Sequence, residues 1–317
     1  MRYIIAIALS IMLLASAAAA IGNGNTIKVE ISEEAEGNQI VGVTLAQITG
    51  AVSDLFGNNN EVEQYQNLIA NDNSLTGFGD DFSSVSQIGL LAANATGSSN
   101  EAYQDILLEV EENYVTDGNI SQLAGLAVEL IGSDNDALQE TYADADENSV
   151  TMSDLIQMSS LDAYAVGNRN WVTQYNFQGA FENCLTNSEL SQQAFVNADI
   201  IGSDNNVGYY VEEWEEWEPD QESVQVAAEN DLTNSLMKQI TCIDQDVTGS
   251  SNWGDQSAIT ISADNCLTEA AMLQSIEEIL KTVGSGNEVD QKIRLHAVDN
   301  VMTGGLIIQD STVITNV

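Results

Sequence analysis

The stretch Gly132–Gln139, GSDNDALQ, opens with a tetrapeptide that returns along the chain. GSDN occurs again at Gly202, and close variants begin at Gly57 (GNNN), Gly97 and Gly249 (GSSN) and Gly284 (GSGN). One such tetrapeptide indicates only a turn, because Gly and Asn both tolerate the positive backbone angles of tight turns. The regular spacing of the copies carries more information.

The Asn of each copy marks a repeat unit. These residues are Asn25, Asn60, Asn100, Asn135, Asn170, Asn205, Asn252 and Asn287, and their steps are 35, 40, 35, 35, 35, 47 and 35 residues. A second Asn occurs once in every unit: Asn38, Asn73, Asn113, Asn148, Asn183, Asn230, Asn265 and Asn300. A fixed period of this size is typical of solenoids, propellers and arrays. The sequence therefore predicts eight repeats.

Two Gln columns accompany the Asn columns. Four residues after the first Asn, six units have Gln: Gln64, Gln104, Gln139, Gln174, Gln256 and Gln291. Nine residues after the second Asn, allowing for one insertion, all eight units have Gln: Gln47, Gln87, Gln122, Gln157, Gln192, Gln239, Gln274 and Gln309. Between these positions apolar and polar residues alternate with a period of two, which predicts strands with one buried face.

These patterns predict an all-β fold, a β-solenoid that stacks eight coils of about 35 residues into a cross-β array. Identical residues then lie above one another at about 4.8 Å. An inward amide would be costly alone, but in a column it can hydrogen-bond to the copies above and below. We therefore expect Gln ladders, and Asn ladders or corners at Asn60, Asn73 and their repeats.

The chain organisation is predicted as follows. Residues 1–20 contain one Arg, an apolar run and Ala18–Ala20, a pattern typical of a secretory signal peptide. A retained membrane anchor is the alternative, although the apolar run is shorter than the about 20 residues that a span needs. Residues 22–317 form a single solenoid domain with loop insertions near 77–86 and 211–226. We expect no membrane span after cleavage of the signal.

The charge excludes several partners. Asp plus Glu number 49 against 7 Lys plus Arg, so the formal net charge is −42. Nucleic acid and anionic lipid are therefore not expected as partners, whereas cations are expected to bind. The residue before the second Asn is acidic in seven units: Asp72, Glu112, Glu147, Glu182, Glu229, Asp264 and Asp299. Either these side chains fan outward at a corner, or they bind Ca²⁺, as a secreted cation-dependent adhesin would require.

Catalytic chemistry finds little support. His296 is the only His, so any Ser-His-Asp or Cys-His site would have to centre on it. Carboxylate pairs are expected by number alone among so many acids. A β-helix enzyme that acts on polysaccharide is the catalytic alternative, and Trp214 and Trp217 in the longer insertion could contact a sugar or a partner. We expect no enzyme and no cofactor, bound Ca²⁺ excepted.

The cysteines are three, Cys184, Cys242 and Cys266. Cys184 and Cys266 share a column two coils apart, about 9.6 Å, which exceeds the about 7 Å limit between the Cα atoms of a disulfide. All three are expected to point outward. They would then be free thiols, or they would form disulfides between subunits.

The Asn and Gln ladders, the Gly-x-x-Asn turns, the secretory signal and the acidic composition resemble those of curli-type functional amyloid subunits. The acidic chain and the 35-residue unit more specifically resemble the sheath proteins of methanogenic archaea, which build amyloid-like tubular cell sheaths. The resemblance implies a secreted structural protein that polymerises with itself around the cell, with other cell-envelope proteins as further partners. Both ends of the repeat array lack a dissimilar capping segment, so we expect end-to-end stacking.

Overall fold

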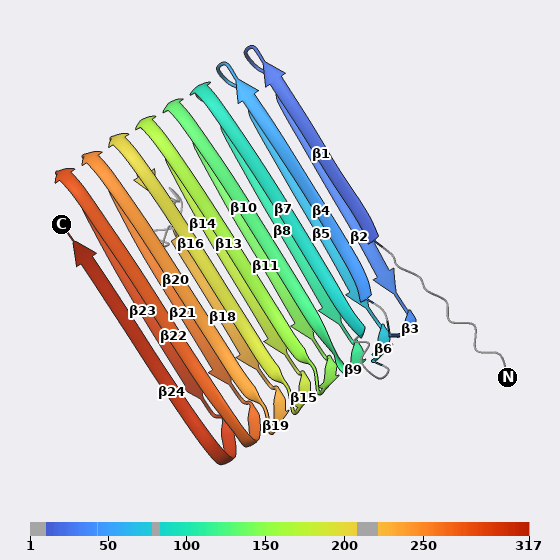
Figure 1. Cartoon of the computed structure of the whole chain (residues 1–317). Coiled ribbons are helices and arrows are strands. Elements are labelled where there is room, and N and C mark those ends of the chain that lie inside the picture. The colour runs from blue at the N-terminus through green and yellow to red at the C-terminus, as the bar shows by residue number, and fades with distance from the viewer. Residues whose placement is uncertain (1–10, 43, 78–82, 208–220, 317) are drawn as a thin grey trace.

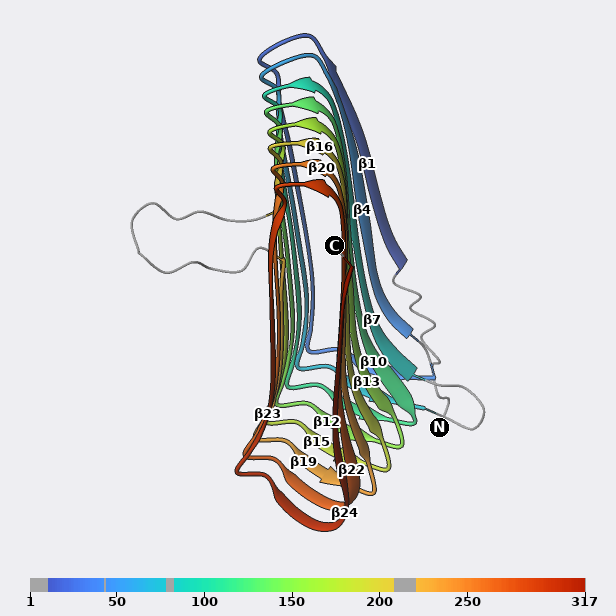
Figure 2. The same ribbon diagram turned by 90° about the vertical axis from the view of Figure 1, so that its left-hand side faces the viewer.

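The computed structural model describes residues 11–42, 44–77, 83–207 and 221–316, and every regular element in these ranges is a β-strand. The chain winds into a flattened solenoid of about eight turns, whose coils follow one another along the stack from the N-terminal to the C-terminal end (Figure 1). Seen along the stack, each coil consists of two long layers joined by tight corners (Figure 2). The predicted all-β solenoid is confirmed.

Sheet A is the larger of the two sheets. Its long strands are β1 (Ile11–Ile21), β4 (Thr44–Phe56), β7 (Ser83–Ser98), β10 (Gly118–Ser133), β13 (Asp154–Asn168), β16 (Glu189–Ser203), β20 (Leu236–Ser250), β22 (Cys266–Ser285) and β24 (Val301–Asn316). Its short strands are β3 (Gln39–Val41), β6 (Ser74–Thr76), β9 (Tyr114–Thr116), β12 (Ser149–Thr151), β15 (Cys184–Thr186) and β19 (Asp231–Thr233).

Sheet B forms the opposite layer. Its strands are β2 (Thr26–Glu36), β5 (Glu61–Asn71), β8 (Glu101–Glu111), β11 (Asp136–Asp146), β14 (Trp171–Phe181), β17 (Asn206–Val207), β18 (Gln221–Ala228), β21 (Trp253–Ala263) and β23 (Glu288–Val298). All pairings in both sheets are parallel, and they join each strand to its counterpart one coil away. Sequence columns and structural columns are therefore the same.

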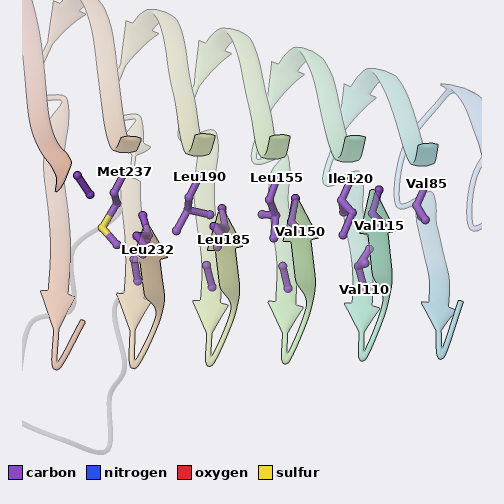
Figure 3. Packing of buried hydrophobic residues seen from close by; sticks show 14 of the residues in the cluster. Val85, Val110, Val115, Ile120, Val150, Leu155, Leu185, Leu190, Leu232 and Met237 are labelled. Atoms are coloured by element: carbon purple, nitrogen blue, oxygen red, sulfur yellow. The ribbon is translucent and has the colours of Figure 1, made fainter. Parts of the chain in front are cut away.

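The core is built from apolar columns that alternate with the polar ladders. A column on the short strands and a column on the long strands of sheet A meet in one cluster, part of which is drawn in Figure 3. The first column contains Leu75, Val115, Val150, Leu185 and Leu232, and the second contains Val85, Ile120, Leu155, Leu190 and Met237. All of these side chains are fully buried. Buried apolar columns agree with the alternation of apolar and polar residues in the sequence, which predicted strands with one buried face.

The Gly-x-x-Asn corners have a definite backbone geometry. In the corner Gly132–Asn135, Gly132 has φ 136° and Asp134 has φ 58°. The same glycine position recurs in each coil, and from Gly57 onward a Cβ atom there would overlap the carbonyl oxygen of the equivalent glycine one coil earlier. The column therefore requires glycine both for its positive φ and for the close approach of the neighbouring backbone.

The Asn of the corner is not the residue with positive φ. At the first and second corners of the coils, the residue immediately before the Asn has φ between 51° and 58° where it is not glycine. These residues include Asp, Glu, Ser and Arg. The tolerance of Asn for positive φ is therefore not what places it at these two corners, and its side chain has another role.

Parts of both predicted insertions belong to strands. Within the range predicted near 77–86, Ser83 begins β7 and pairs in register with Gly118. Within the range predicted near 211–226, Gln221 begins β18 and pairs with Gln174 and Gln256. Inward and outward side chains alternate again from Glu222 onward, within the range predicted as the second insertion. Residues 78–82 and 208–220, including Trp214 and Trp217, lie outside the described residues.

We predict that Gly167→Ala destabilises the solenoid by at least about 2 kcal/mol, because the new Cβ meets the Gly132 carbonyl and the residue keeps a positive φ. Chemical denaturation followed by circular dichroism measures the change. Gly50→Ala is the matched control, since its Cβ lies 3.6 Å from the Leu90 carbonyl oxygen at an ordinary φ. Equal stability of the two variants would contradict the assigned corner geometry.

Candidate functional site: the ladders and the two ends of the solenoid

The eight-residue Gln column of sheet A is a continuous ladder. Each Nε2 donates to the Oε1 of the Gln one coil earlier, from Gln87 to Gln47 and on to Gln309 and Gln274, over 2.7–3.1 Å. Seven of these eight side chains are buried, as expected, and Gln309 in the last coil is exposed. The ladder satisfies polar groups that would otherwise be costly inside the core.

The same amides also join the two sheets. Gln157 Nε2 donates to the backbone carbonyls of Ala143 on β11 and Gly179 on β14, at 3.0 and 2.7 Å. Gln192 Nε2 donates to the carbonyl of Gln178 in the same way. Each Gln therefore ties its coil to the neighbouring coil and sheet A to sheet B.

A second Gln ladder lies in sheet B. Gln104, Gln139 and Gln174 each donate to the Gln one coil earlier at 2.8–3.0 Å, and Gln291 donates to Gln256 at 2.9 Å. The sequence showed six of these residues. The backbone register adds Gln221 to the column, which sequence spacing missed because the insertion before β18 displaces it.

The Asn ladders act on the backbone. In both Asn columns the backbone N–H of each Asn donates to the Oδ1 of the Asn one coil later, at 2.9–3.2 Å. Many of the Nδ2 groups donate to a backbone carbonyl or to the same Oδ1. A corner thus keeps its polar backbone satisfied through the Asn side chain of its neighbour.

A third corner was missed in the sequence. It follows the short strands, and the left-handed residue there is Asp117, Met152, Asn187, Asn234 or Glu269. Ser Oγ atoms replace the Asn side chains: Gly118 N–H donates to Ser153, Ser153 N–H to Ser188, and Ser188 N–H to Ser235. The available signal was a Ser five residues after the second Asn, which is present in only a few units.

The predicted acidic column faces solvent. Asp72, Glu112, Glu147, Glu182, Glu229, Asp264 and Asp299 are all exposed and have a left-handed backbone. The pKa of Glu112 is raised by a hydrogen bond with Asp72 and by the charges of Asp72 and Glu147. Within the described residues, no group of three or more His, Cys, Asp or Glu side chains has the geometry of a metal site. The column fans outward, and Ca²⁺ binding stays a hypothesis.

The remaining candidate residues lie on the outer surface. Cys184 and Cys266 are exposed, Cys242 is half-buried, and none of the three forms a disulfide within the chain. Cys184 pairs in register with Asp231, which pairs with Cys266, so the two thiols are two coils apart as predicted. His296 is an exposed residue of β23.

The C-terminal end of the stack is an uncovered sheet edge. In β24, Val301, Leu306 and Val313 are each more than half exposed. Ile307 is 39% exposed, whereas its register partner Met272 in the preceding coil is 1% exposed. The difference arises because no further coil covers β24 in the described part of the chain. Long apolar edges of this kind are templates for pairing with another chain.

The two ends carry complementary halves of the ladders. At the C-terminal end, the backbone N–H groups of Asn287 and Asn300 occupy positions that in every earlier coil donate to an Asn Oδ1. At the N-terminal end, Asn25 and Asn38 present such Oδ1 atoms, with no preceding coil to use them among the described residues. The Gln ladder of sheet A runs the other way, with Gln309 Oε1 and Gln47 Nε2 at its two ends.

The fold and the ladders define a β-solenoid repeat protein. Comparisons with protein-family models, with curated proteins and with solved structures found no match to this chain. Among the described residues, no helix is long and apolar enough to cross a membrane. Functional inference therefore depends on the geometry of this chain alone.

We predict that Gln157→Leu lowers the free energy of unfolding by about 1–3 kcal/mol, because Gln122, Gln192 and two backbone carbonyls lose buried hydrogen-bond partners. The double variant with Gln192→Leu should also weaken assembly. Gln193→Leu is the control, since this neighbouring side chain points outward and is half-buried. Denaturant unfolding of the three variants tests the ladder, and a stability for Gln157→Leu equal to that of Gln193→Leu would contradict its role.

One buried acid interrupts an apolar column. Glu278 is fully buried between the register positions of Ile243 and Val313, and its carboxylate has no side-chain hydrogen-bond partner among the described residues. Burial raises the pKa of Glu278 to about 8, the charge of Asp255 adds to the rise, and the Ala258 backbone N–H opposes it. The carboxyl group is therefore neutral in the folded chain at neutral pH.

We predict that Glu278→Gln stabilises the protein at high pH. A carboxyl group whose pKa is raised by folding costs stability as pH rises above its unfolded value of about 4.5, and the full cost is reached above about 8. Thermal unfolding of the wild type and the variant should agree near pH 5 and differ by on the order of 2–4 kcal/mol at pH 9. Glu277→Gln, on the exposed neighbour, is the control; a pH-independent difference would refute the assignment.

Proposed function

We propose that this protein is a secreted structural subunit that assembles with itself, end to end, into an extracellular amyloid-like sheath, tube or fibre. The observation that carries the proposal is the complementarity of the two solenoid ends. Donors of the Asn ladders are presented at one end and their acceptors at the other, in the register of the repeat. A second copy placed on the end would continue every column that the chain repeats internally.

The apolar columns support the same arrangement. Ile307 continues the column of Leu45 and Met272, and Gln309 continues that of Gln47 and Gln274. Stacking of a second copy would bury side chains that are exposed only because they belong to the last coil. Because one end binds the opposite end, the contact is heterologous and generates either a ring or an open filament.

The N-terminal strand β1 would delay assembly until the signal peptide is removed. In the full chain, β1 pairs with β4 over Ile11–Ile21 and Ala46–Phe56, so β1 covers the sheet A edge of the first coil. A β24 strand from another copy would need the same edge. Removal of residues 1–20, proposed as a signal peptide, would free this edge at the time of export. Thiol linkage through the outward Cys184, Cys242 and Cys266 remains part of the proposal as a later cross-link between subunits.

The exported protein should form filaments above a critical concentration, even in reductant, because strand pairing rather than disulfide formation drives assembly. X-ray diffraction of aligned material should show a meridional repeat of about 4.8 Å and an equatorial spacing of about 10 Å. Unprocessed chain purified from a cytosol is the comparison, and its critical concentration should be higher because β1 covers β4. An exported protein that stays monomeric by sedimentation at every concentration would refute the proposal.

A further inference from the structure

Basic residues are rare in this chain, and their positions are informative. Beyond Arg2 there are Lys28, Arg169, Lys238, Lys281, Lys292 and Arg294. Three of them form ion pairs with an acid one coil away at the equivalent position of the repeat: Lys28 with Glu63, Arg169 with Asp134, and Lys281 with Asp246. Lys238 is the exception inside the stack, because its register neighbours are Ser191 and Leu273. The other three basic residues each lie directly against an acid of the neighbouring coil.

Lys292 and Arg294 lack such a partner in the described residues, where neither forms an ion pair. Both lie on the outward face of β23, the last sheet B strand, together with Asp290 and His296, and all four are exposed. The outward face of β2, the first sheet B strand, presents Lys28, Glu30, Ser32 and Glu34, also exposed. These two strands form the opposite ends of sheet B (Figure 1).

The repeat register determines which of these residues would lie opposite one another if a second copy were stacked on the end. The column of Lys28 and Glu63 ends at Asp290, the column of Glu30 and Tyr65 ends at Lys292, and the column of Glu34 ends at His296. A second copy stacked in the same register would therefore place Asp290 against Lys28 of the partner subunit. Lys292 would lie against Glu30 of the partner subunit, and His296 against Glu34 of the partner subunit.

Arg294 strengthens this match. Its column ends at Ser32, so it would lie diagonally between Glu30 and Glu34 of the partner subunit. Diagonal neighbours on a sheet are within reach of long side chains. Lys292, Arg294 and His296 on the β23 face thus each meet an acid or lie between two acids, and Asp290 meets a base.

We infer that these outward charges of β23 and β2 form an intermolecular ladder that selects head-to-tail contact with a second copy of this chain. The inference rests on the proposed assembly. The corner glycines and Asn residues set the register, whereas the charges determine which end is recognised. Contact between two β2 ends would bring the acids Glu30 and Glu34 of one copy near the same pair of acids in the other, and like charges directly opposite one another are destabilising. Such recognition matters in a chain of net charge −42, whose copies repel one another at long range.

Two charge reversals and their mixture test the inference with exported protein in reductant. K292E places two acids at the seam, and E30K places two bases there. Each variant alone should raise the critical concentration by about tenfold, which corresponds to about 1.4 kcal/mol. An equimolar mixture should co-assemble at a concentration within about twofold of the wild type, because each end then meets its opposite charge; this result also shows that both variants are folded.

The controls are K238E and E129K, which make the same charge changes on the outer face of inner coils. They should leave the critical concentration within about twofold of the wild type. Added salt is a poor probe, because it screens the repulsion between acidic chains as well as the seam. If K292E and E30K assemble as readily as their controls, or if their mixture assembles no better than either alone, the charge ladder is refuted while assembly itself stands. Failure of the wild type to assemble would overturn both proposals.

Discussion

The whole structure depends on the hydrogen bond from one side chain to its own copy one coil away. Parallel, in-register stacking repeats every residue at about 4.8 Å, so a buried amide such as Gln157 always has Gln122 and Gln192 as neighbours. Burying an unpaired amide would cost free energy, but in this geometry each buried amide is hydrogen-bonded to its copies in the neighbouring coils. The chain can therefore use Gln and Asn as core residues alongside Leu, Val and Ala.

The same stacking imposes strict requirements at the corners. A corner must turn the chain in few residues while its backbone N–H and carbonyl groups still meet those of the next coil. Gly167 and its copies allow the close approach, and the left-handed residue two positions later turns the chain. The Oδ1 atom of the corner Asn then accepts a hydrogen bond from the backbone N–H of the equivalent Asn one coil earlier. Acidic side chains at many left-handed positions point into solvent, which spreads the large negative charge over the corners rather than the core.

Within the described residues, no further layer covers the last coil. Ile307 is therefore more exposed than its register partner Met272, which a following coil does cover. Ordinary β-proteins hide or charge such edges. Here, the charges on β2 and β23 are arranged in columns of opposite sign, which is compatible with selective contact rather than simple repulsion. Glu33 and Glu278 show that inward acids are also placed near the two ends, where burial raises their pKa values.

Periodicity was enough to predict the fold class, the number of coils, the inward columns and the outward cysteines, because a parallel stack maps every residue onto the residue one period later. The function of each column became visible only in the folded chain. The structure showed that Asn side chains serve the neighbour's backbone, that the residue before the Asn adopts positive φ, and that Ser153, Ser188 and Ser235 form a third corner ladder. It also showed that Gln221 rejoins its column after the insertion. Sequence periodicity specifies which residues are neighbours along the stack, whereas donor direction, corner conformation and contact between the two sheets depend on how the coil closes in three dimensions.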